Sequence, residues 1–215
     1  MELKIMDNQS LQIVSLRSGM EHRSDSVLDI SLRGGQHLAL SGRSGSGKSS
    51  LLKVLAGLLP AQSGYFSWQS EVIQPGNLRW WRQQFCYLPQ SPVMGAETLA
   101  EAIRLPWRLK AVNDGMPDDN ACCESLRSLE IRHDLDKAVA ELSGGEQQRV
   151  AIVRALLMER PVWLMDEPTS ALDHTSRDMV MALLAAKSLT CVSVSHDPHW
   201  LERADQVVDM GERHG

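Results

Sequence analysis

The chain has 215 residues, of which 43% are apolar and 23% are charged, and its formal net charge is −5. This length is enough for one domain with its own core, and the acidic balance argues against nucleic acid as a partner, because binding a phosphate backbone requires a basic surface. No apolar run is long enough to cross a bilayer, and the first residues lack the pattern of a signal peptide. The four cysteines lack the spacing of a disulfide framework, so we expect reduced thiols.

The first half of the chain contains strand patterns on both sides of one helical pattern. The expected strands are 11–16, 26–32, 36–42, 65–68 and 85–89. After Gly47 the apolar residues recur at three- and four-residue spacing, which predicts a helix that ends near Leu58. The sequence PAQSG at 60–64 breaks this pattern before the next strand.

The second half is expected to contain most of the helices. From residue 92 to residue 141 the pattern is helical and more polar, with a loop at 113–119. A helix is predicted over Glu146–Met158, and the unbroken apolar run at 162–166 predicts a buried strand. The remaining expected elements are a helix at 175–186, a strand at 189–195, a short helix near Trp200 and a strand at 206–210. Strands that alternate with helices predict an α/β fold with a mainly parallel sheet.

A phosphate-binding motif lies between an expected strand and an expected helix. Residues 42–49 read GRSGSGKS and fit the pattern G-x-x-x-x-G-K-[ST], the P-loop. Its glycines let backbone N–H groups turn toward an anion, Lys48 reaches the β- and γ-phosphates, and the Ser49 hydroxyl ligates Mg²⁺. The expected nucleotide-binding residues are Gly42, Arg43, Ser44, Gly45, Ser46, Gly47, Lys48, Ser49 and Ser50.

Two acidic residues follow the buried strand at 162–166. This strand delivers Asp166 at its carboxyl end, which is where ligands bind in an open α/β sheet. Asp166 is placed to hold Mg²⁺, and Glu167 beside it is placed to orient or deprotonate an attacking water. Such a pair is weak evidence alone, and the P-loop upstream makes it strong.

A second glycine-containing turn, LSGGE at 142–146, opens the helix predicted at Glu146. Ser143 and Glu146 fit a capping box, which is a purely structural role. That role does not account for Gly144 and Gly145, because glycine inside a helix costs about 1 kcal/mol relative to alanine. Close approach of a second anion to this backbone would account for both glycines.

With these motifs the chain resembles the ATP-binding cassette (ABC) family over nearly its whole length. LSGGE looks like the family's signature sequence, Gln90 in YLPQSP like its Q-loop glutamine, and His196 in VSVSHD like its switch histidine. The sequence SALD at 170–173 looks like its D-loop. The resemblance implies a P-loop NTPase (RecA-like) core with a mainly parallel sheet, antiparallel strands at the N-terminus and an inserted α-helical subdomain. It implies one ABC ATPase domain over 1–215, with its core in 1–90 and 143–215 and its helical subdomain in 91–142.

The resemblance also implies that the chain is an ATPase whose ATP lies between two copies packed head to tail. Ser143 and Gly145 of one copy, with Gly144 between them, would meet the γ-phosphate that Lys48 of the other copy holds. Asp173 would lie where the loops of the two copies meet. One chain would therefore supply half of each of two sites.

The remaining roles implied by the resemblance concern the metal and the water. Ser49, Gln90 and Asp166 would ligate Mg²⁺, directly or through water. Glu167, His196 and Gln90 would form the catalytic set, in which His196 also bonds the γ-phosphate. ATP and Mg²⁺ are thus the expected substrate and cofactor.

The implied partner is a membrane protein. We expect a separate multi-span permease, with this chain bound peripherally at the cytoplasmic face of the inner (cell) membrane. Residues 81–110 look most like small stand-alone bacterial subunits implicated in iron export, so iron or another metal ion is the expected cargo. The alternatives are the ATPase of an importer or of a lipid or peptide exporter and, in a different class, a soluble ABC ATPase of DNA repair or translation. The insert of about fifty residues between Gln90 and Ser143 is too short for the coiled coil of the repair class.

Two features of the resemblance stay open. Trp107, with Arg104 and Arg108 at helical spacing, is either an exposed anchor for the permease or part of the helical subdomain's own core. The aromatic residue that stacks on adenine in the family has no counterpart before the P-loop, where His22 or Met20 lies instead. We therefore expect weak selection of the nucleobase.

Overall fold

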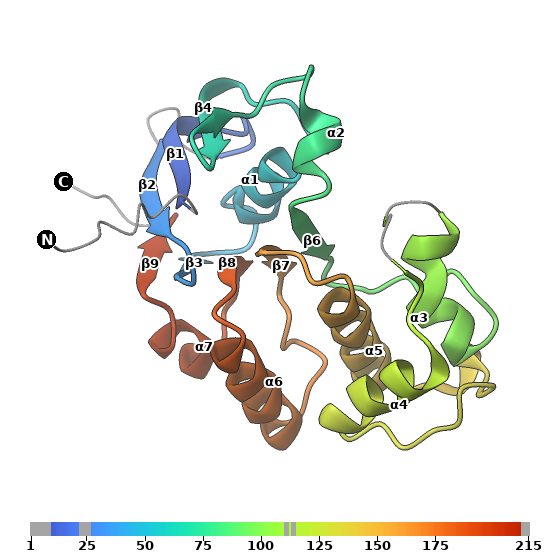
Figure 1. Ribbon diagram of the computed structural model, residues 1–215. Coiled ribbons are helices and arrows are strands. Elements are labelled where there is room, and N and C mark those ends of the chain that lie inside the picture. Colours follow the sequence, from blue (N-terminus) through green and yellow to red (C-terminus); the bar gives the residue numbers. More distant parts are fainter. Residues whose placement is uncertain (1–9, 22–26, 110–111, 113–114, 212–215) are drawn as a thin grey trace, which may run out of the picture.

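The computed structural model describes residues 10–21, 27–109, 112 and 115–211, which form two β-sheets and a set of helices (Figure 1). The strands are β1 (Ser10–Arg17), β2 (Leu28–Arg33), β3 (His37–Ser41), β4 (Ser63–Trp68), β5 (Glu71–Val72), β6 (Phe85–Leu88), β7 (Val162–Asp166), β8 (Thr190–Val194) and β9 (Gln206–Asp209). The helices are α1 (Lys48–Leu55), α2 (Leu78–Trp81), α3 (Leu99–Arg108), α4 (Asp119–Ser128), the 3₁₀ turn η1 (Val139–Glu141), α5 (Gly144–Leu157), α6 (His174–Ala186) and α7 (Pro198–Glu202). None of these helices is long and apolar enough to span a membrane.

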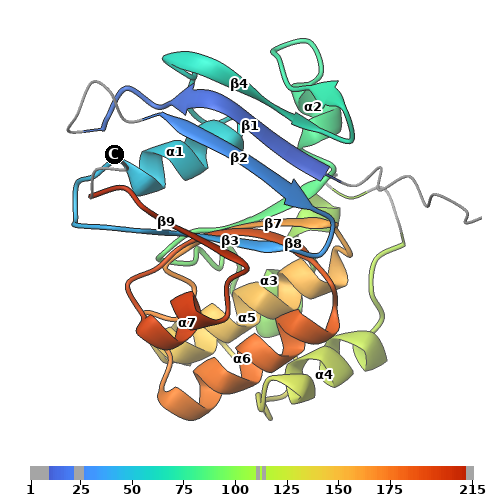
Figure 2. The same ribbon diagram turned by 90° about the vertical axis from the view of Figure 1, so that its left-hand side faces the viewer.

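The two sheets differ in direction and in position. Strands β2, β1, β4 and β5 form an antiparallel sheet in that order, and β6, β7, β8, β3 and β9 form a parallel sheet. Figure 2 shows the antiparallel sheet above α1, the parallel sheet in the middle, and α5, α6 and α7 beneath it. The predicted α/β fold, with a mainly parallel sheet and antiparallel strands at the N-terminus, is confirmed.

Two apolar clusters join these layers through alternate residues of the same strands. In β7, Val162 and Leu164 face the cluster that α1 and the antiparallel sheet cover, whereas Trp163 and Met165 face the cluster that α5 and α6 cover. Because both faces are covered, all five residues of β7 are buried, which is why the strand reads as an unbroken apolar run.

The small helix α2, which the sequence pattern did not indicate, is held by its last residue. Trp81 is fully buried, and its ring packs against Phe66 and Phe85. Its indole Nε1 donates a hydrogen bond of 2.7 Å to the carbonyl oxygen of Leu55 at the end of α1. The tryptophan therefore ties the antiparallel sheet, α1 and β6 together.

Helices α3 and α4 pack against α5 at one side of the molecule (Figure 1). A capping box between Thr98 and Glu101 defines the start of α3, and the side chain of Asp118 caps α4. Both helices lie within the predicted helical subdomain at 91–142, whose limits stay a prediction.

The structure decides between the two hypotheses for Trp107. Its side chain is only 8% exposed, and it lies on the face of α3 that packs inward. Arg104 forms an ion pair with Asp119 at 2.5 Å, and Arg108 pairs with Glu101 at 3.1 Å. The hypothesis of an exposed aromatic anchor is therefore wrong, because the indole is buried and both arginines are paired within the helical region.

Candidate functional site

The expected phosphate-handling residues lie at the carboxyl ends of parallel strands. The P-loop follows β3, Gln90 follows β6, Asp166 ends β7, and His196 follows β8. The carboxyl ends of parallel strands meet at one edge of a sheet, where open α/β sheets bind their ligands. The sheet order therefore gathers segments that are far apart in the sequence.

Glycines shape the turn between β3 and α1. Gly42 has a φ of 123°, and a Cβ atom there would lie 2.9 Å from Oδ1 of Asp209. Gly47 has a φ of 93° and is the N-cap of α1, where no side chain caps the helix. The first N–H groups of α1 are thus left to meet an anion, as expected of a P-loop.

The ammonium group of Lys48 lies beneath this turn. The side chain is 5% exposed, and Nζ donates hydrogen bonds to the carbonyl oxygens of Gly42 at 2.6 Å and Arg43 at 2.8 Å. Burial lowers the pKa of Lys48, and the carboxylates of Glu167 and Asp166 act in the opposite direction. The nearby carboxylates therefore help to keep a buried cation charged where phosphate is expected.

A hydroxyl of the P-loop and a carboxylate beside it form a suitable pair of magnesium ligands. The hydroxyl of Ser49 donates a hydrogen bond of 2.9 Å to Oδ1 of Asp166, whose side chain is almost fully buried. Mg²⁺ prefers hydroxyl and carboxylate oxygens to softer ligands. Gln90 and Ser49 line one cavity beside the P-loop, whereas Asp166 lies behind Ser49 and does not line it. The donor set present fits Mg²⁺.

Glu167 is held in an unusual backbone conformation beside His196. Its φ is 49°, in the left-handed region that residues other than glycine rarely adopt, and its N–H donates to the carbonyl oxygen of Val194 at 2.9 Å. Its carboxylate accepts the backbone N–H of His196 at 3.4 Å, and Oε1 lies 3.4 Å from Nε2 of His196. Burial raises the pKa of Glu167, and His196 opposes this rise. A carboxylate of raised pKa is suited to accepting a proton from water.

Most of these side chains line one open cavity of about 590 Å³. The predicted site residues that line it are Ser44, Gly45, Gly47, Lys48, Ser49, Ser50, Gln90, Glu167 and His196. Met20, Ser170 and Val194 complete its lining. The other predicted P-loop residues, Gly42, Arg43 and Ser46, lie in the turn without lining the cavity.

The signature residues lie elsewhere, at the start of α5. Ser143 is the N-cap, and the helix begins at Gly144, two residues before the predicted start. A Cβ atom on Gly145 would lie 2.9 Å from the carbonyl oxygen of Ala171, so this glycine permits close contact with the D-loop of its own chain. Gly144 is exposed, and a Cβ atom there would meet nothing within 4 Å. Of the two glycines, Gly144 is thus the one left open to a group from outside.

Two polar residues near the site were not singled out from the sequence. Gln148 of α5 is fully buried, and its Nε2 donates to the carbonyl oxygen of Pro168 at 3.1 Å, which ties α5 to the segment after Glu167. Asp209 ends β9 beside Gly42. A carboxylate after an apolar strand was a usable signal for Asp209. Gln148 gave none, because a glutamine in a helix is usually exposed.

Comparisons with known proteins agree with this geometry. A family model described as ABC transporter matches residues 26–170. The probable iron export ATP-binding protein FetA of Escherichia coli (strain K12) is 32% identical over 188 residues, which are 85% of this chain and 82% of that protein. The chain belongs to the ABC transporter family. As an ABC ATP-binding domain, it is an ATPase that binds ATP.

Longer members of the ABC family also match. The macrolide export ATP-binding/permease protein MacB of Azoarcus sp. (strain BH72) is 33% identical over 214 residues, which are 93% of this chain and 32% of MacB. A bacterial Atm1-family ABC exporter, whose structure was solved with ATP bound, has a TM-score of 0.79 at 22% identity, and the match covers 94% of this chain and 37% of that one. The chain thus spans about a third of both longer proteins, and the exporter structure shows the shared fold.

None of the described residues that line the cavity is a Phe, Tyr or Trp. Met20 lines the cavity beside the P-loop and is 63% exposed, whereas His22 lies outside the described residues. A thioether side chain is flexible and adapts to many shapes, so it selects weakly among flat rings.

We expect the wild-type chain to bind ATP and GTP with similar affinity, and Met20→Tyr to strengthen the binding of both. Base stacking on an aromatic ring contributes about 1 to 3 kcal/mol, so a gain of about fivefold or more is expected. Isothermal titration calorimetry measures the affinity of each chain for ATP and for GTP, and Met20→Leu is the control that adds no ring. A wild-type preference for ATP above about a hundredfold, equal to about 2.8 kcal/mol, would contradict the expectation.

Proposed function

We propose that the chain is the ATP-hydrolysing subunit of an exporter and that two copies complete each other's nucleotide sites. One observation carries this proposal: the P-loop cavity contains Lys48, Glu167 and His196, whereas Ser143 and Gly144 lie outside it at the exposed start of α5. Both elements suit phosphate, and a single chain does not bring them to one cavity. Head-to-tail packing of two copies would place the signature of each against the cavity of the other.

Each residue then has a distinct role in hydrolysis. Lys48 would offset the charge of the β- and γ-phosphates, and Ser143 with the N–H groups after it would bind the γ-phosphate from the other copy. Glu167 would orient a water and take its proton as the water attacks phosphorus, while His196 holds that carboxylate in place. Mg²⁺ bound by Ser49 and Asp166 would neutralise phosphate charge.

Glu167→Gln is expected to accumulate ATP-bound dimers. The amide keeps the shape of the side chain but accepts no proton, so ATP and the second copy stay bound. Lys48→Ala is expected to lose nucleotide binding and to remain monomeric, because the charge beneath the P-loop is removed. Size-exclusion chromatography with Mg·ATP separates the two outcomes.

The matching kinetic measurement uses the wild-type chain. Its ATPase activity per molecule should rise with protein concentration, because a monomer lacks the second half of its site. Activity per molecule that stays constant down to nanomolar concentrations would contradict the split site, as would a Glu167→Gln chain that stays monomeric with Mg·ATP.

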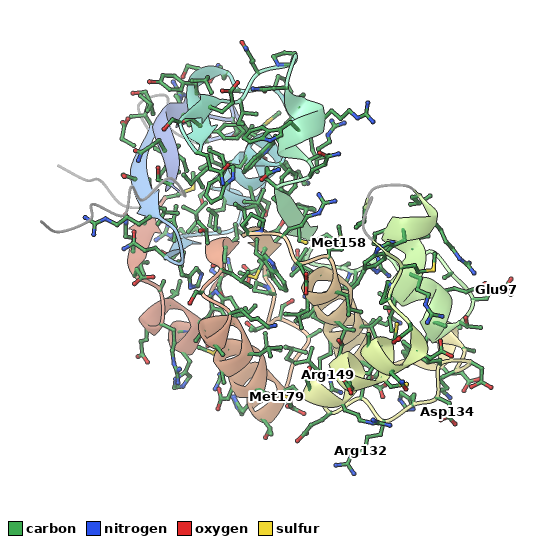
Figure 3. All side chains as sticks on the ribbon, in the orientation of Figure 1. Glu97, Arg132, Asp134, Arg149, Met158 and Met179 are labelled. Carbon is green, nitrogen blue, oxygen red and sulfur yellow. The ribbon has the colours of Figure 1, made fainter. Side chains whose placement is uncertain are left out.

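We also propose that a separate permease binds in a groove of about 600 Å³ between α2, β6 and α5. Met158, labelled in Figure 3, lines it at the end of α5. Much of the lining is apolar, as at Phe85 and Val93, and Val93 is 74% exposed. The groove includes Pro89, which precedes the Q-loop residue Gln90, so an occupant would contact the segment that leads into the nucleotide cavity.

Charge indicates what occupies this groove. The basic side chains that line it are those of Arg79, Arg82, Arg154 and Arg160, and no carboxylate of the described residues lines it. Arg154 donates to the carbonyl oxygens of Val93 and Met94, and burial lowers its pKa. A short permease helix with apolar side chains and at least one carboxylate would complement both the surface and the charge.

Val93→Glu is expected to abolish co-purification with the permease without changing basal ATPase activity. The substitution places a negative charge at the exposed apolar rim, where it would be buried on docking and would repel an acidic helix. Leu109→Glu is the matched control, since Leu109 is 70% exposed but does not line the groove. Equal recovery of the permease with both variants would overturn the docking surface.

The cargo is proposed to be iron or another metal ion, and the chain is proposed to lie at the cytoplasmic face of the inner membrane. Similarity to FetA, which covers 85% of this chain, supports the cargo. Cells that lack the gene should then retain more iron than wild-type cells, as measured by elemental analysis. The wild-type gene should restore the lower level and the Lys48→Ala gene should not. Unchanged iron in the deletion strain would contradict the cargo and leave the ATPase unaffected.

A further inference from the structure

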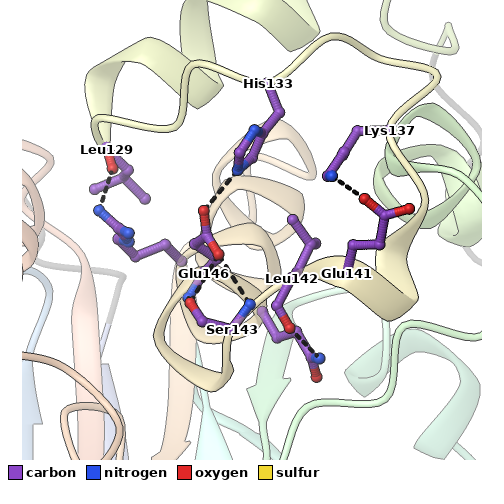
Figure 4. Close-up of polar contacts among 9 residues, drawn as sticks. Leu129, His133, Lys137, Glu141, Leu142, Ser143 and Glu146 are labelled. Carbon is purple, nitrogen blue, oxygen red and sulfur yellow. Dashed lines mark hydrogen bonds and ion pairs between the residues drawn. The ribbon is translucent and has the colours of Figure 1, made fainter.

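A chain of hydrogen bonds connects the segment after α4 to the signature serine (Figure 4). Nε2 of His133 lies 2.6 Å from Oε1 of Glu146. The other oxygen, Oε2, accepts the backbone N–H of Ser143 at 2.8 Å and its hydroxyl at 2.7 Å. Glu146 therefore accepts three hydrogen bonds, which is more than a capping box requires.

The segment that carries His133 has little freedom to leave α5. Ile131 is almost fully buried, and its N–H donates to the carbonyl oxygen of Leu126 at 3.0 Å. Nη1 of Arg149 in α5 donates to the carbonyl oxygen of Leu129 at 3.1 Å; the dashed line at Leu129 in Figure 4 marks this bond. The imidazole is therefore brought to Glu146 by backbone that is held against α4 and α5 just before His133.

The bonds of Ser143 restrict what its hydroxyl can do. A hydroxyl has one proton to donate, and here it goes to Glu146, while Oγ accepts the N–H of Glu146 at 3.3 Å. To donate to a phosphate, the hydroxyl must turn away from the carboxylate. Glu146 would then keep the N–H of Ser143 and the bond from His133, so it would not be left without donors.

The position of Glu146 also matters because the group is charged. The hydrogen bond from His133, followed by those from Ser143, lowers the pKa of Glu146 to about 2. A carboxylate free to turn toward the γ-phosphate would repel it. A carboxylate held on the side of His133 keeps its charge away from the exposed face at Gly144.

We propose that His133 is a positioning residue of the signature: it retains Glu146 while the hydroxyl of Ser143 changes its partner from that carboxylate to the γ-phosphate bound by the other copy. The inference rests on the proposed function, because it requires Ser143 to meet a nucleotide across the dimer. A purely structural capping box would instead affect the stability of α5 and leave dimerisation unchanged.

The test measures the dissociation constant of the dimer with Mg·ATP by analytical ultracentrifugation, in full-length Glu167→Gln chains. His133→Ala should weaken the dimer by about 25-fold, which is about fivefold, or about 1 kcal/mol, for the hydrogen bond lost at each of the two signatures. His133→Gln should restore the dimer to within about threefold of the parent, because an amide N–H can replace Nε2 as the donor. Binding of nucleotide to the monomer should not change, since His133 does not line the P-loop cavity.

A matched control lies in the same segment. Lys137 forms an ion pair with Glu141, four residues further on, and the hydrogen bonds of the Ser143 side chain and N–H go to Glu146 and not to this pair. Lys137→Ala should leave the dimer unchanged. A loss of dimer with Lys137→Ala as large as that with His133→Ala would overturn the inference, because disturbance of the segment would then explain both.

A second variant keeps the inference testable if His133→Ala lowers the stability of the protein. Glu146→Gln keeps the capping box, in which glutamine is equally suitable, and removes the charge. Adding His133→Ala to Glu146→Gln should then change the dimer by less than about twofold, as expected when two residues act through one contact. If His133→Ala has the same effect with Glu146 as with Glu146→Gln, the inference about His133 is overturned and the proposed function is unaffected. If the parent Glu167→Gln chain stays monomeric, both the inference and the proposed function are overturned.

Discussion

The buried ammonium group of Lys48 constrains the arrangement of the nucleotide site. A charge removed from water needs nearby opposite charge and hydrogen bonds to remain ionised. Here the carbonyl oxygens of the P-loop accept its hydrogen bonds, and the carboxylates of Asp166, Glu167 and Asp209 supply the opposite charge. Asp166 ends β7, Glu167 comes directly after it, and Asp209 ends β9. In the parallel sheet β9 lies beside β3 and β7 lies two strands away on the other side, so the sheet order brings these carboxylates toward Lys48.

Sequence patterns predicted the parts of the fold in which the residue types along the chain match the burial or the backbone conformation that the fold imposes on them. Strand β7 is buried on both faces and reads as an apolar run, and the P-loop has glycine where its backbone takes a positive φ. The short elements β5 and α2 escaped prediction because their positions are set by distant contacts. Trp81 in α2 is fixed by Phe66 and by the carbonyl oxygen of Leu55, and neither contact leaves a periodic pattern.

The two glycines of the signature serve different purposes, and the sequence alone does not distinguish them. From the sequence, both glycines were attributed to the approach of one external anion. In the structure, Gly145 is required by a carbonyl oxygen of its own D-loop, whereas Gly144 has open space in front of it. The proposal that a phosphate from another copy approaches this turn therefore depends on Gly144 and Ser143. The contact at Gly145 instead keeps the D-loop and the signature in register within one chain.

Helix α5 connects the signature, the segment that follows Glu167 and the proposed permease groove. Near its start, Glu146 bonds to Ser143 and to His133 of the segment that follows α4. Further along, Gln148 donates to the carbonyl oxygen of Pro168, and Arg154 lines the proposed permease groove. Energetic coupling between distant sites travels well through a rigid element whose contacts at each end have two arrangements. A change at the groove that shifts α5 along its axis would alter the environment of Glu167 and the position of Ser143 together, because the same helix carries both contacts. The coupling of transport to hydrolysis can therefore be sought in the seating of this one helix.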